Sequence, residues 1–191
     1  MKLSWSHKLF FRVNAQVGKR KWVDGLMYFC AHWLIYIIGI MAMWWGAFSL
    51  VDEQPDLFVG FIKLLLTGLV LAEILSYGIA LLWRHPRPYI EFPHIKYILK
   101  PVESWKSFPS DHTIFSFIFA LITIHIGAPL VLSGLLIVLA MLVAYGRVYV
   151  GVHYPRDIVG GLFLAVVFAL GAPWLLEYVT QPMYNVIGLF F

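Results

Sequence analysis

Charged residues are scarce in this chain of 191 residues: they make up 13% of it, whereas hydrophobic residues make up 61%. Soluble domains carry about 25% charged residues, so this scarcity excludes an ordinary aqueous surface and with it a soluble enzyme. Cysteine is limited to Cys30, which excludes an intrachain disulfide and a metal site built from several cysteines. The composition therefore indicates one integral membrane domain.

Long apolar runs, by contrast, are abundant. A helix needs roughly 20 apolar residues to cross about 30 Å of hydrocarbon. Five stretches come near that length, the third of them being short: 29–51, 57–83, 112–127, 129–146 and 158–178. Pro129 and Pro155 mark helix starts, as proline in a first turn does. The sequence thus predicts an all-α integral membrane protein, a bundle of about five transmembrane helices.

The first 28 residues interleave six basic residues with apolar ones. This pattern suits an amphipathic helix at the membrane interface better than a crossing or a cleavable signal peptide. We therefore divide the chain into an interfacial basic segment, 1–28, and a transmembrane domain, 29–191.

The order of the stretches brings the polar segments to one membrane face. The third and fourth stretches form a hairpin through residues 127–128, so segments 84–111 and 147–157 must share a face with the N-terminal segment. That face receives every one of the fourteen Lys and Arg residues except Lys63. The positive-inside rule assigns it to the cytoplasm, although basic residues that bind a substrate are placed by chemistry and weaken the rule.

The first polar cluster follows the second apolar stretch, where two prolines flank an arginine in residues 83–89, WRHPRPY. The prolines stop the helix and hold the chain extended, so Arg87 is held stiffly. Its guanidinium either offers a planar, permanently charged fork to a phosphate or lies at the interface as a basic residue that ends a span.

The second cluster, residues 107–113 (SFPSDHT), stands directly before the short third stretch. Ser110 occupies the position of an N-cap and His112 lies in the first helical turn. Unpaired N–H groups and the positive end of the helix dipole make such a terminus an anion site, where a histidine can protonate a departing phosphate oxygen. The alternative is a plain N-cap beside an interfacial histidine.

The third cluster, residues 146–157 (GRVYVGVHYPRD), joins the fourth stretch to the fifth and contains Arg147, His153 and Asp157. A carboxylate four residues after a histidine can accept its ring N–H, fix the tautomer and leave the other nitrogen as a nucleophile. Pro155 interrupts helical geometry, so this pairing must come from a turn. The alternatives are an interfacial pair or two metal ligands, and the shortage of cysteines and nearby carboxylates disfavours a metal.

Together, the clusters bring arginines, two histidines, a serine and an aspartate to one face of a bundle too apolar for soluble substrates, which points to phosphoryl chemistry on a lipid. In this combination the chain resembles the type 2 phosphatidic acid phosphatase superfamily, whose motifs are Lys-x6-Arg-Pro, Pro-Ser-Gly-His and Ser-Arg-x5-His-x3-Asp. The matching positions are Arg87-Pro88, then Pro109-Ser110 with His112, then Arg147 with His153 and Asp157.

The resemblance implies a role for each matched residue in a reaction that needs no metal or cofactor. His153 would attack phosphorus to form a phosphohistidine, Asp157 would orient it and His112 would protonate the leaving group. The predicted substrate-binding residues, which lie in or beside the motifs, are Arg87, Ser110, Arg147, Asp111, Arg84 and Glu91. Glu91 would accept from an arginine or lie in solvent.

Three positions depart from the superfamily motifs: Ala80 stands in place of the first lysine, Asp111 in place of glycine and Gly146 in place of serine. The bacitracin-resistance-type undecaprenyl-diphosphate phosphatases resemble this chain in lacking that lysine and in having Asp before the histidine. A diphosphate carries more charge than a monoester, which fits the extra cations of the 84–111 loop, Arg84, Lys96, Lys100 and Lys106.

The resemblance therefore implies conversion of undecaprenyl diphosphate to undecaprenyl phosphate and phosphate, which recycles the lipid carrier of cell-wall glycans. The alternatives are phosphatidylglycerophosphate, phosphatidate or another prenyl diphosphate as substrate, and a lipid-binding or transport protein instead of an enzyme. The expected partners are the polyprenyl diphosphate and membrane lipids, without nucleic acid. We expect the protein to lie in the bacterial inner membrane. The resemblance implies that its site faces the periplasm, whereas the count of basic residues favours the cytoplasm.

One ionisable residue, Glu73, falls in the middle of the second stretch. An ionisable group there is costly enough to require a partner or a cavity. The candidate partners in the sequence are Lys63, Ser76 and Tyr77.

Overall fold

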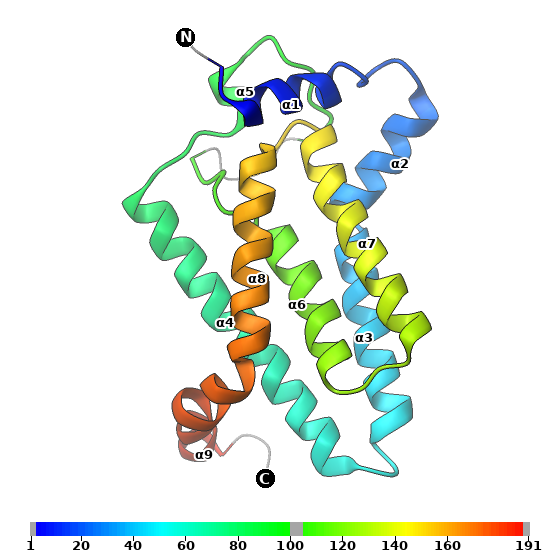
Figure 1. Cartoon of the computed structure of the whole chain (residues 1–191), viewed down its shortest axis with the longest axis vertical. Coiled ribbons are helices and arrows are strands. Elements are labelled where there is room, and N and C mark those ends of the chain that lie inside the picture. The colour runs from blue at the N-terminus through cyan, green and yellow to red at the C-terminus, as the bar shows by residue number, and fades with distance from the viewer. Residues whose placement is uncertain (1–2, 100–104, 189–191) are drawn as a thin grey trace.

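The computed structural model describes residues 3–99 and 105–188, and these residues form helices joined by loops (Figure 1). The elements are, in order, α1 (Trp5–Asn14), α2 (Lys21–His32), α3 (Leu34–Leu50), α4 (Pro55–Leu82), α5 (Pro88–Glu91), α6 (Asp111–His125), α7 (Leu130–Tyr149), α8 (Pro155–Leu175), a π-helical segment (Leu176–Thr180) and α9 (Gln181–Ile187). The prediction of an all-α chain is confirmed.

Three helical stretches of the described residues are long and apolar enough to cross a membrane: α4, α7 and Pro155–Val186, which begins with α8. A fourth crossing results if α2 and α3, which meet at an angle of 51°, count as one broken span. The molecule is thus an integral membrane protein with several candidate spans. The predicted stretch 29–51 is not one straight helix, and the boundary predicted at residue 28 falls inside α2.

The third predicted stretch, α6, has 15 residues and does not reach the length of a span by itself. At 1.5 Å per residue it covers about 22 Å, against about 30 Å of hydrocarbon. It packs against α3, α4, α7 and α8, so it is the central helix of the bundle. Ile114, Ile118 and Ile122 are fully or almost fully buried and recur every four residues, which places them on one helical face.

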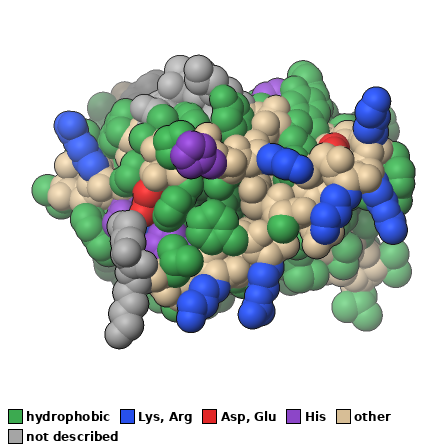
Figure 2. All heavy atoms as spheres, turned by 90° about the horizontal axis from the view of Figure 1, so that it is seen from above, with side chains coloured by type: hydrophobic (Ala, Val, Ile, Leu, Met, Phe, Trp, Pro, Cys, Tyr) green, Lys and Arg blue, Asp and Glu red, His purple; other side chains and the backbone are tan. Residues whose placement is uncertain are grey.

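The polar segments meet in the upper part of Figure 1, where α7 ends and α8 begins below α1 and α5, and where α4 ends and α6 begins lower down. The Ser110 N–H donates to the Asp157 carbonyl oxygen at 3.1 Å, which joins the second polar cluster to the third. Seen from above, Lys and Arg side chains spread over this face between areas of hydrophobic surface (Figure 2). The predicted convergence of segments 84–111 and 147–157 is therefore confirmed.

Helix α1 lies across this end and contacts α7 and α8 (Figure 1). Ser4 caps it in a capping box with His7. Phe10 is fully buried, with its ring centroid 5.2 Å from that of Tyr154, whereas Trp5 is 60% exposed. The helix therefore has one face fixed to the bundle and one face that carries exposed apolar surface.

Candidate active site

The guanidinium of Arg87 lies beside the predicted nucleophile. Arg87 is the N-cap residue of α5 and precedes Pro88, which sets the first helical turn. Its side chain is buried, and its Nη1 donates to the Val152 carbonyl oxygen at 3.3 Å and to His153 Nε2 at 3.1 Å. This arginine does not extend to the interface as the alternative interpretation required.

The imidazole of His153 is fixed in one tautomer by its two partners. Its Nδ1 lies 2.8 Å from the carbonyl oxygen of Ser107, which can only accept, so Nδ1 carries the proton. Its Nε2 faces an N–H of Arg87, which can only donate, so Nε2 has its lone pair free of a proton. The predicted division of the ring into an oriented N–H and a nucleophilic nitrogen therefore has the required geometry.

The sequence led us to expect that Asp157 accepts the ring N–H of His153, and the structure does not show this hydrogen bond. Its Oδ2 lies 3.7 Å from His153 Nδ1, beyond hydrogen-bond distance. The same oxygen accepts instead from the Ser107 hydroxyl at 2.6 Å and from the Tyr154 N–H at 2.8 Å. The carboxylate therefore binds two residues that surround the histidine, Ser107 and Tyr154.

The surroundings of His153 favour the neutral ring. Burial has the largest effect, and the positive charges of Arg87 and Arg147 add to it, so the pKa of His153 is held well below its usual range. The hydrogen bond to Ser107 acts in the opposite direction and is outweighed. A neutral imidazole between two cations is the form that can attack an anionic phosphorus centre.

The turn that carries His153 depends on a glycine. Gly151 has a φ of +87°, in the left-handed region that side chains disfavour. A Cβ atom at this position would also lie 3.0 Å from the Lys96 carbonyl oxygen. The chain can therefore reverse between α7 and α8, and bring His153 under the 84–99 segment, because no side chain is present there.

Arg147 projects from the last turn of α7 into the interior. It is buried, and its Nη1 donates to the Ala31 carbonyl oxygen of α2 at 3.0 Å. Its Nε has no hydrogen-bond partner among the described residues. The adjacent Gly146, where the superfamily motif has serine, lets α2 approach closely, since a Cβ there would lie 3.0 Å from the Ala31 amide nitrogen.

The start of α6 completes the cluster. Ser110 is its N-cap residue, as predicted, but its hydroxyl accepts from Thr113 Oγ1 at 3.0 Å and makes no capping bond to a backbone N–H. The first N–H groups of α6 thus remain for another acceptor. The ring of His112, in the first turn, makes no hydrogen bond within the described part of the chain, so its nitrogens are available to a ligand.

Asp111 belongs to a neighbouring ionic cluster, which also holds Lys106 and Glu73. The ammonium group of Lys106 donates to Asp111 Oδ1, lies 3.7 Å from Glu73 Oε1 and stands 4.5 Å from the ring centroid of Tyr77. Ser76 donates to the same Asp111 oxygen at 2.7 Å. Glu73 therefore pairs with Lys106, whereas its candidate partner Lys63 donates to Gln181 at 3.2 Å.

Two predicted substrate-binding residues lie outside the cluster around His153. Arg84 is exposed, with its guanidinium carbon 5.7 Å from the ring centroid of Trp105. Glu91 neither binds an arginine nor lies free in solvent: its Oε2 accepts from the Tyr154 hydroxyl at 2.8 Å, and Oε1 lies 3.6 Å from His7 Nε2. Burial and the contact with Glu91 raise the pKa of the Tyr154 hydroxyl, so it stays a donor.

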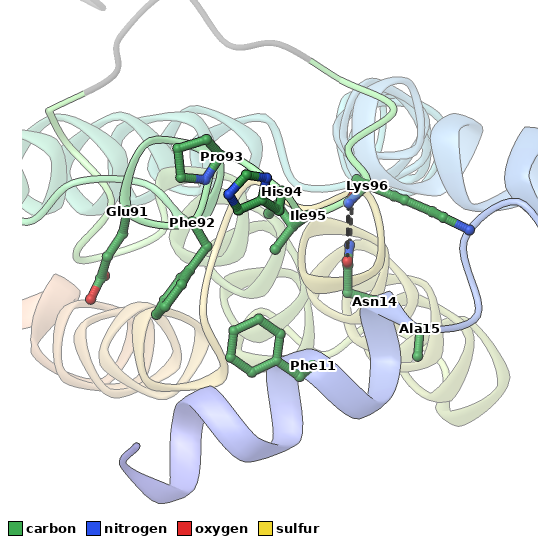
Figure 3. Close-up of a pocket in the computed structure, with 9 residues that line it drawn as sticks. All are labelled: Phe11, Asn14, Ala15, Glu91, Phe92, Pro93, His94, Ile95 and Lys96. Atoms are coloured by element: carbon green, nitrogen blue, oxygen red, sulfur yellow. Dashed lines mark hydrogen bonds between the residues drawn. The ribbon is translucent and has the colours of Figure 1, made fainter. Parts of the chain in front are cut away.

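A pocket of about 480 Å³ lies between α1 and residues 91–96, and Glu91 is on its wall (Figure 3). Asn14 bridges the two sides, since its amide donates to the Lys96 carbonyl oxygen at 2.5 Å. Lys96 Nζ donates to the Val17 carbonyl oxygen at 3.2 Å, so this predicted extra cation fastens the N-terminal segment. The cluster around His153 does not line this pocket, and Lys100 lies outside the described residues.

Ser107 and Lys106 are the residues of this region whose contacts the sequence did not reveal. Ser107 belongs to the SFPSDHT cluster, but its carbonyl oxygen, the acceptor for His153, has no signature in a sequence. Lys106 is 1% exposed, and a lysine in a loop is ordinarily solvated. Within the described residues, no three His, Cys, Asp or Glu side chains come together as a potential metal site.

Comparison with known proteins places this arrangement in a family. Residues 61–181 match the PAP2 superfamily. The chain is 33% identical over 182 residues to the putative undecaprenyl-diphosphatase YbjG of Escherichia coli (strain K12), covering 93% of this chain and 85% of that protein. It is 27% identical over 168 residues to the undecaprenyl-diphosphatase BcrC of Bacillus subtilis (strain 168), covering 85% and 79%.

The fold is also similar to that of a solved protein, Aquifex aeolicus LpxE, with a TM-score of 0.70 at 21% identity, covering 91% of this chain and 97% of that one. The matched family segment begins in α4 and ends at the start of α9, so it includes all three polar clusters. The family match and the 33% identity to YbjG show that this chain belongs to the PAP2 superfamily.

Proposed function

We propose that the protein is a metal-independent lipid-diphosphate phosphatase that forms a phosphohistidine at His153. The observation that carries the proposal is the state of this ring, whose Nδ1–H is bound by a main-chain carbonyl and whose Nε2 lone pair faces Arg87. A buried nucleophile with a fixed tautomer, next to a cation that binds phosphate oxygens, is the arrangement that nucleophilic catalysis on phosphorus requires.

In the first step, the distal phosphate would bind between Arg87, Arg147 and the N–H groups at the start of α6. His153 Nε2 attacks phosphorus and forms the N–P bond while the P–O bond to the leaving group breaks. His112 gives its proton to the departing oxygen. In the second step, water gives a proton to His112 and attacks the phosphohistidine, the N–P bond breaks, and inorganic phosphate leaves.

The substrate we propose is undecaprenyl diphosphate, which would yield undecaprenyl phosphate and recycle the lipid carrier of cell-wall glycans. The names of the two relatives support this substrate, since one is a putative undecaprenyl-diphosphatase and the other an undecaprenyl-diphosphatase. The integral membrane character supports a lipid of this kind, because the reacting phosphate then lies at the bundle end while the chain stays in the bilayer.

We further propose a bacterial inner membrane location with five crossings, in which the short α6 crosses inside a ring of longer helices, and with the site facing the periplasm. Of the predicted segment 1–28, the part that precedes α2 would lie along the interface, which the exposed Trp5 and Leu9 support. The basic end of the molecule opposes this orientation under the positive-inside rule, so the orientation needs its own test.

For that test, Arg84→Cys is made in a variant that lacks Cys30 and is probed in intact cells with an impermeant thiol reagent. Labelling before lysis is the expected result, since Arg84 is exposed at the end that carries the site. Glu53→Cys, in the turn at the opposite end, serves as the matched control and should be labelled only after lysis. The reverse pattern would place the site in the cytoplasm.

The test of the function measures phosphate release in detergent and EDTA from undecaprenyl diphosphate, phosphatidylglycerophosphate and phosphatidate. We expect release from the prenyl diphosphate, its loss in His153→Ala and its retention in His125→Ala, a matched histidine at the far end of α6. Preference for a glycerophospholipid would overturn the substrate and keep the chemistry. Absence of release from all three lipids would favour the lipid-binding or transport alternative.

A further inference from the structure

We propose that Ser107 is the positioning residue of the nucleophilic histidine, an inference that rests on the proposed function. Its carbonyl oxygen orients His153, and its hydroxyl transmits the influence of Asp157 to that carbonyl. In this arrangement the carboxylate acts on the nucleophile through Ser107.

The hydrogen bonds of Ser107 carry the inference. Ser107 is completely buried and uses three of its polar groups. Its N–H donates to the His85 carbonyl oxygen at 3.0 Å, its carbonyl oxygen accepts from His153 Nδ1 at 2.8 Å, and its hydroxyl donates to Asp157 Oδ2 at 2.6 Å. It is therefore the residue through which the second polar cluster contacts both the predicted nucleophile and the predicted orienting carboxylate.

The competing arrangement is a direct bond between Asp157 and His153. The 3.7 Å between Oδ2 and Nδ1 exceeds hydrogen-bond distance, and Nδ1 has a single N–H, which Ser107 already accepts. Asp157 Oδ2 receives two shorter donors, the Ser107 hydroxyl and the Tyr154 N–H. The carboxylate thus fixes the two segments that flank the imidazole, one before α6 and one before α8.

Ser107 is held from its other side as well. The preceding residue, Lys106, has its side chain buried in the ionic cluster with Asp111 and Glu73, which fastens the segment to α4 and α6. The main chains of His85 and Lys106 also pair as an isolated bridge. The carbonyl of Ser107 therefore has little freedom to follow a misplaced imidazole, which is the property a positioning group needs.

A carbonyl acceptor suits the chemistry of this site. A neutral acceptor orients the N–H without drawing its proton as strongly as a carboxylate would, so the ring stays neutral beside two arginines. As the N–P bond forms, positive charge develops on the ring, and the carbonyl dipole together with the more distant carboxylate stabilises it. The proton remains on Nδ1 throughout, and the bonds made and broken are those of the proposed reaction.

The experiment compares Ser107→Ala, Ser107→Thr, Asp157→Asn and the Ser107→Ala/Asp157→Asn double variant in single-turnover formation of phosphohistidine from undecaprenyl diphosphate. Loss of a hydrogen bond to a charged group predicts a decrease of roughly 10- to 100-fold in the rate for Ser107→Ala with KM little changed, and recovery of most of the rate in Ser107→Thr. The rate of the double variant should lie within about threefold of the rate of the slower single variant, because both changes break the same Ser107–Asp157 hydrogen bond.

Ser133→Ala is the matched control, since this buried serine hydroxyl donates to the Ala128 carbonyl oxygen at the opposite end of α7 and should leave the rate unchanged. Folding of each variant is monitored in detergent by the reactivity of the buried Cys30. Multiplying effects in the double variant, or a folded Ser107→Thr as slow as Ser107→Ala, would overturn the inference while the proposed function stands. Absence of turnover in the unmodified protein would instead overturn the proposed function.

Discussion

The buried ammonium group of Lys106 offers the most direct test of the packing around the site. The perturbation is Lys106→Met, which keeps an unbranched apolar side chain of similar length and removes the charge. The side chain of Lys106 is 0% exposed, and those of its partners Glu73 and Asp111 are 30% and 24% exposed. The substitution leaves two carboxylates close together without their cation.

Breaking a buried ion pair by removal of one partner costs about 3–5 kcal/mol, because the remaining charge is uncompensated. Water reaches both carboxylates of this cluster in part, so we expect a loss of about 3 kcal/mol. In a chain of this length, 1 kcal/mol shifts Tm by about 2–4 °C, so Lys106→Met should lower Tm by roughly 6–12 °C. Addition of Glu73→Gln to the variant should recover part of the lost stability, because it removes one of the two carboxylates that no longer face the Lys106 ammonium group.

The assay follows thermal unfolding in detergent with a dye that fluoresces on reaction with thiols. Cys30 is the only cysteine of the chain and is 3% exposed, so the signal reports loss of packing. Lys8→Met, at an exposed position of α1, is the matched control and should leave Tm unchanged. A loss below 2 °C in Lys106→Met, or no recovery on addition of Glu73→Gln, would refute the reasoning.

Three further predictions concern the site itself. The pKa of His153 lies well below the unfolded value near 6.5, so the ring stays neutral as the pH falls through that value, and kcat/KM should show no loss from His153 protonation between pH 7 and 6. Arg87→Gln removes a charge that lowers this pKa, so it should move the acidic limb of the pH profile to higher pH. A profile of Arg87→Gln with an unmoved limb would contradict this cause. Gly146→Ser, which restores the serine of the superfamily motif, should destabilise the protein by about 1–3 kcal/mol because its Cβ meets the α2 backbone. Gly134→Ser is the control and should not destabilise the protein, since a Cβ there has no neighbour within 4 Å. Equal thermal stability of the two variants would be evidence against the close approach of α2 and α7. Arg147→Lys should lower kcat/KM by 10-fold or more, because an ammonium group cannot bind the Ala31 carbonyl and a phosphate with a planar fork; a change below twofold in phosphate release would contradict the role.

The positions of the main helices could be predicted from the sequence because apolar length alone determines where a chain can cross a membrane. The convergence of Arg87, His112 and His153 could also be predicted, since the hairpin of the third and fourth stretches leaves the flanking polar segments no other face. The bend between α2 and α3 could not, because the run 29–51 has no proline and its single histidine, His32, does not by itself indicate a helix break. In lipid, an apolar run carries no information on where a helix breaks.

The contacts inside the site were harder to predict for two physical reasons. The acceptor for His153 is a main-chain carbonyl, and every residue has one, so the sequence pointed to the side chain of Asp157 instead. The partner of Glu73 is Lys106, which lies in a loop and reaches α4 only through the fold. An ion pair between distant segments has no spacing that a sequence pattern could reveal.

The break between α2 and α3 has a consequence for Arg147, which we propose binds phosphate. In one straight helix, the carbonyl oxygen of Ala31 would accept from the N–H of residue 35, which would compete with any donor from another helix. Because α2 ends at His32, that oxygen is open, and Arg147 donates to it across the bundle. The break in the span and the orientation of the buried Arg147 side chain are therefore linked. A substitution that straightens the span should reduce activity although it changes no residue that we propose to bind phosphate.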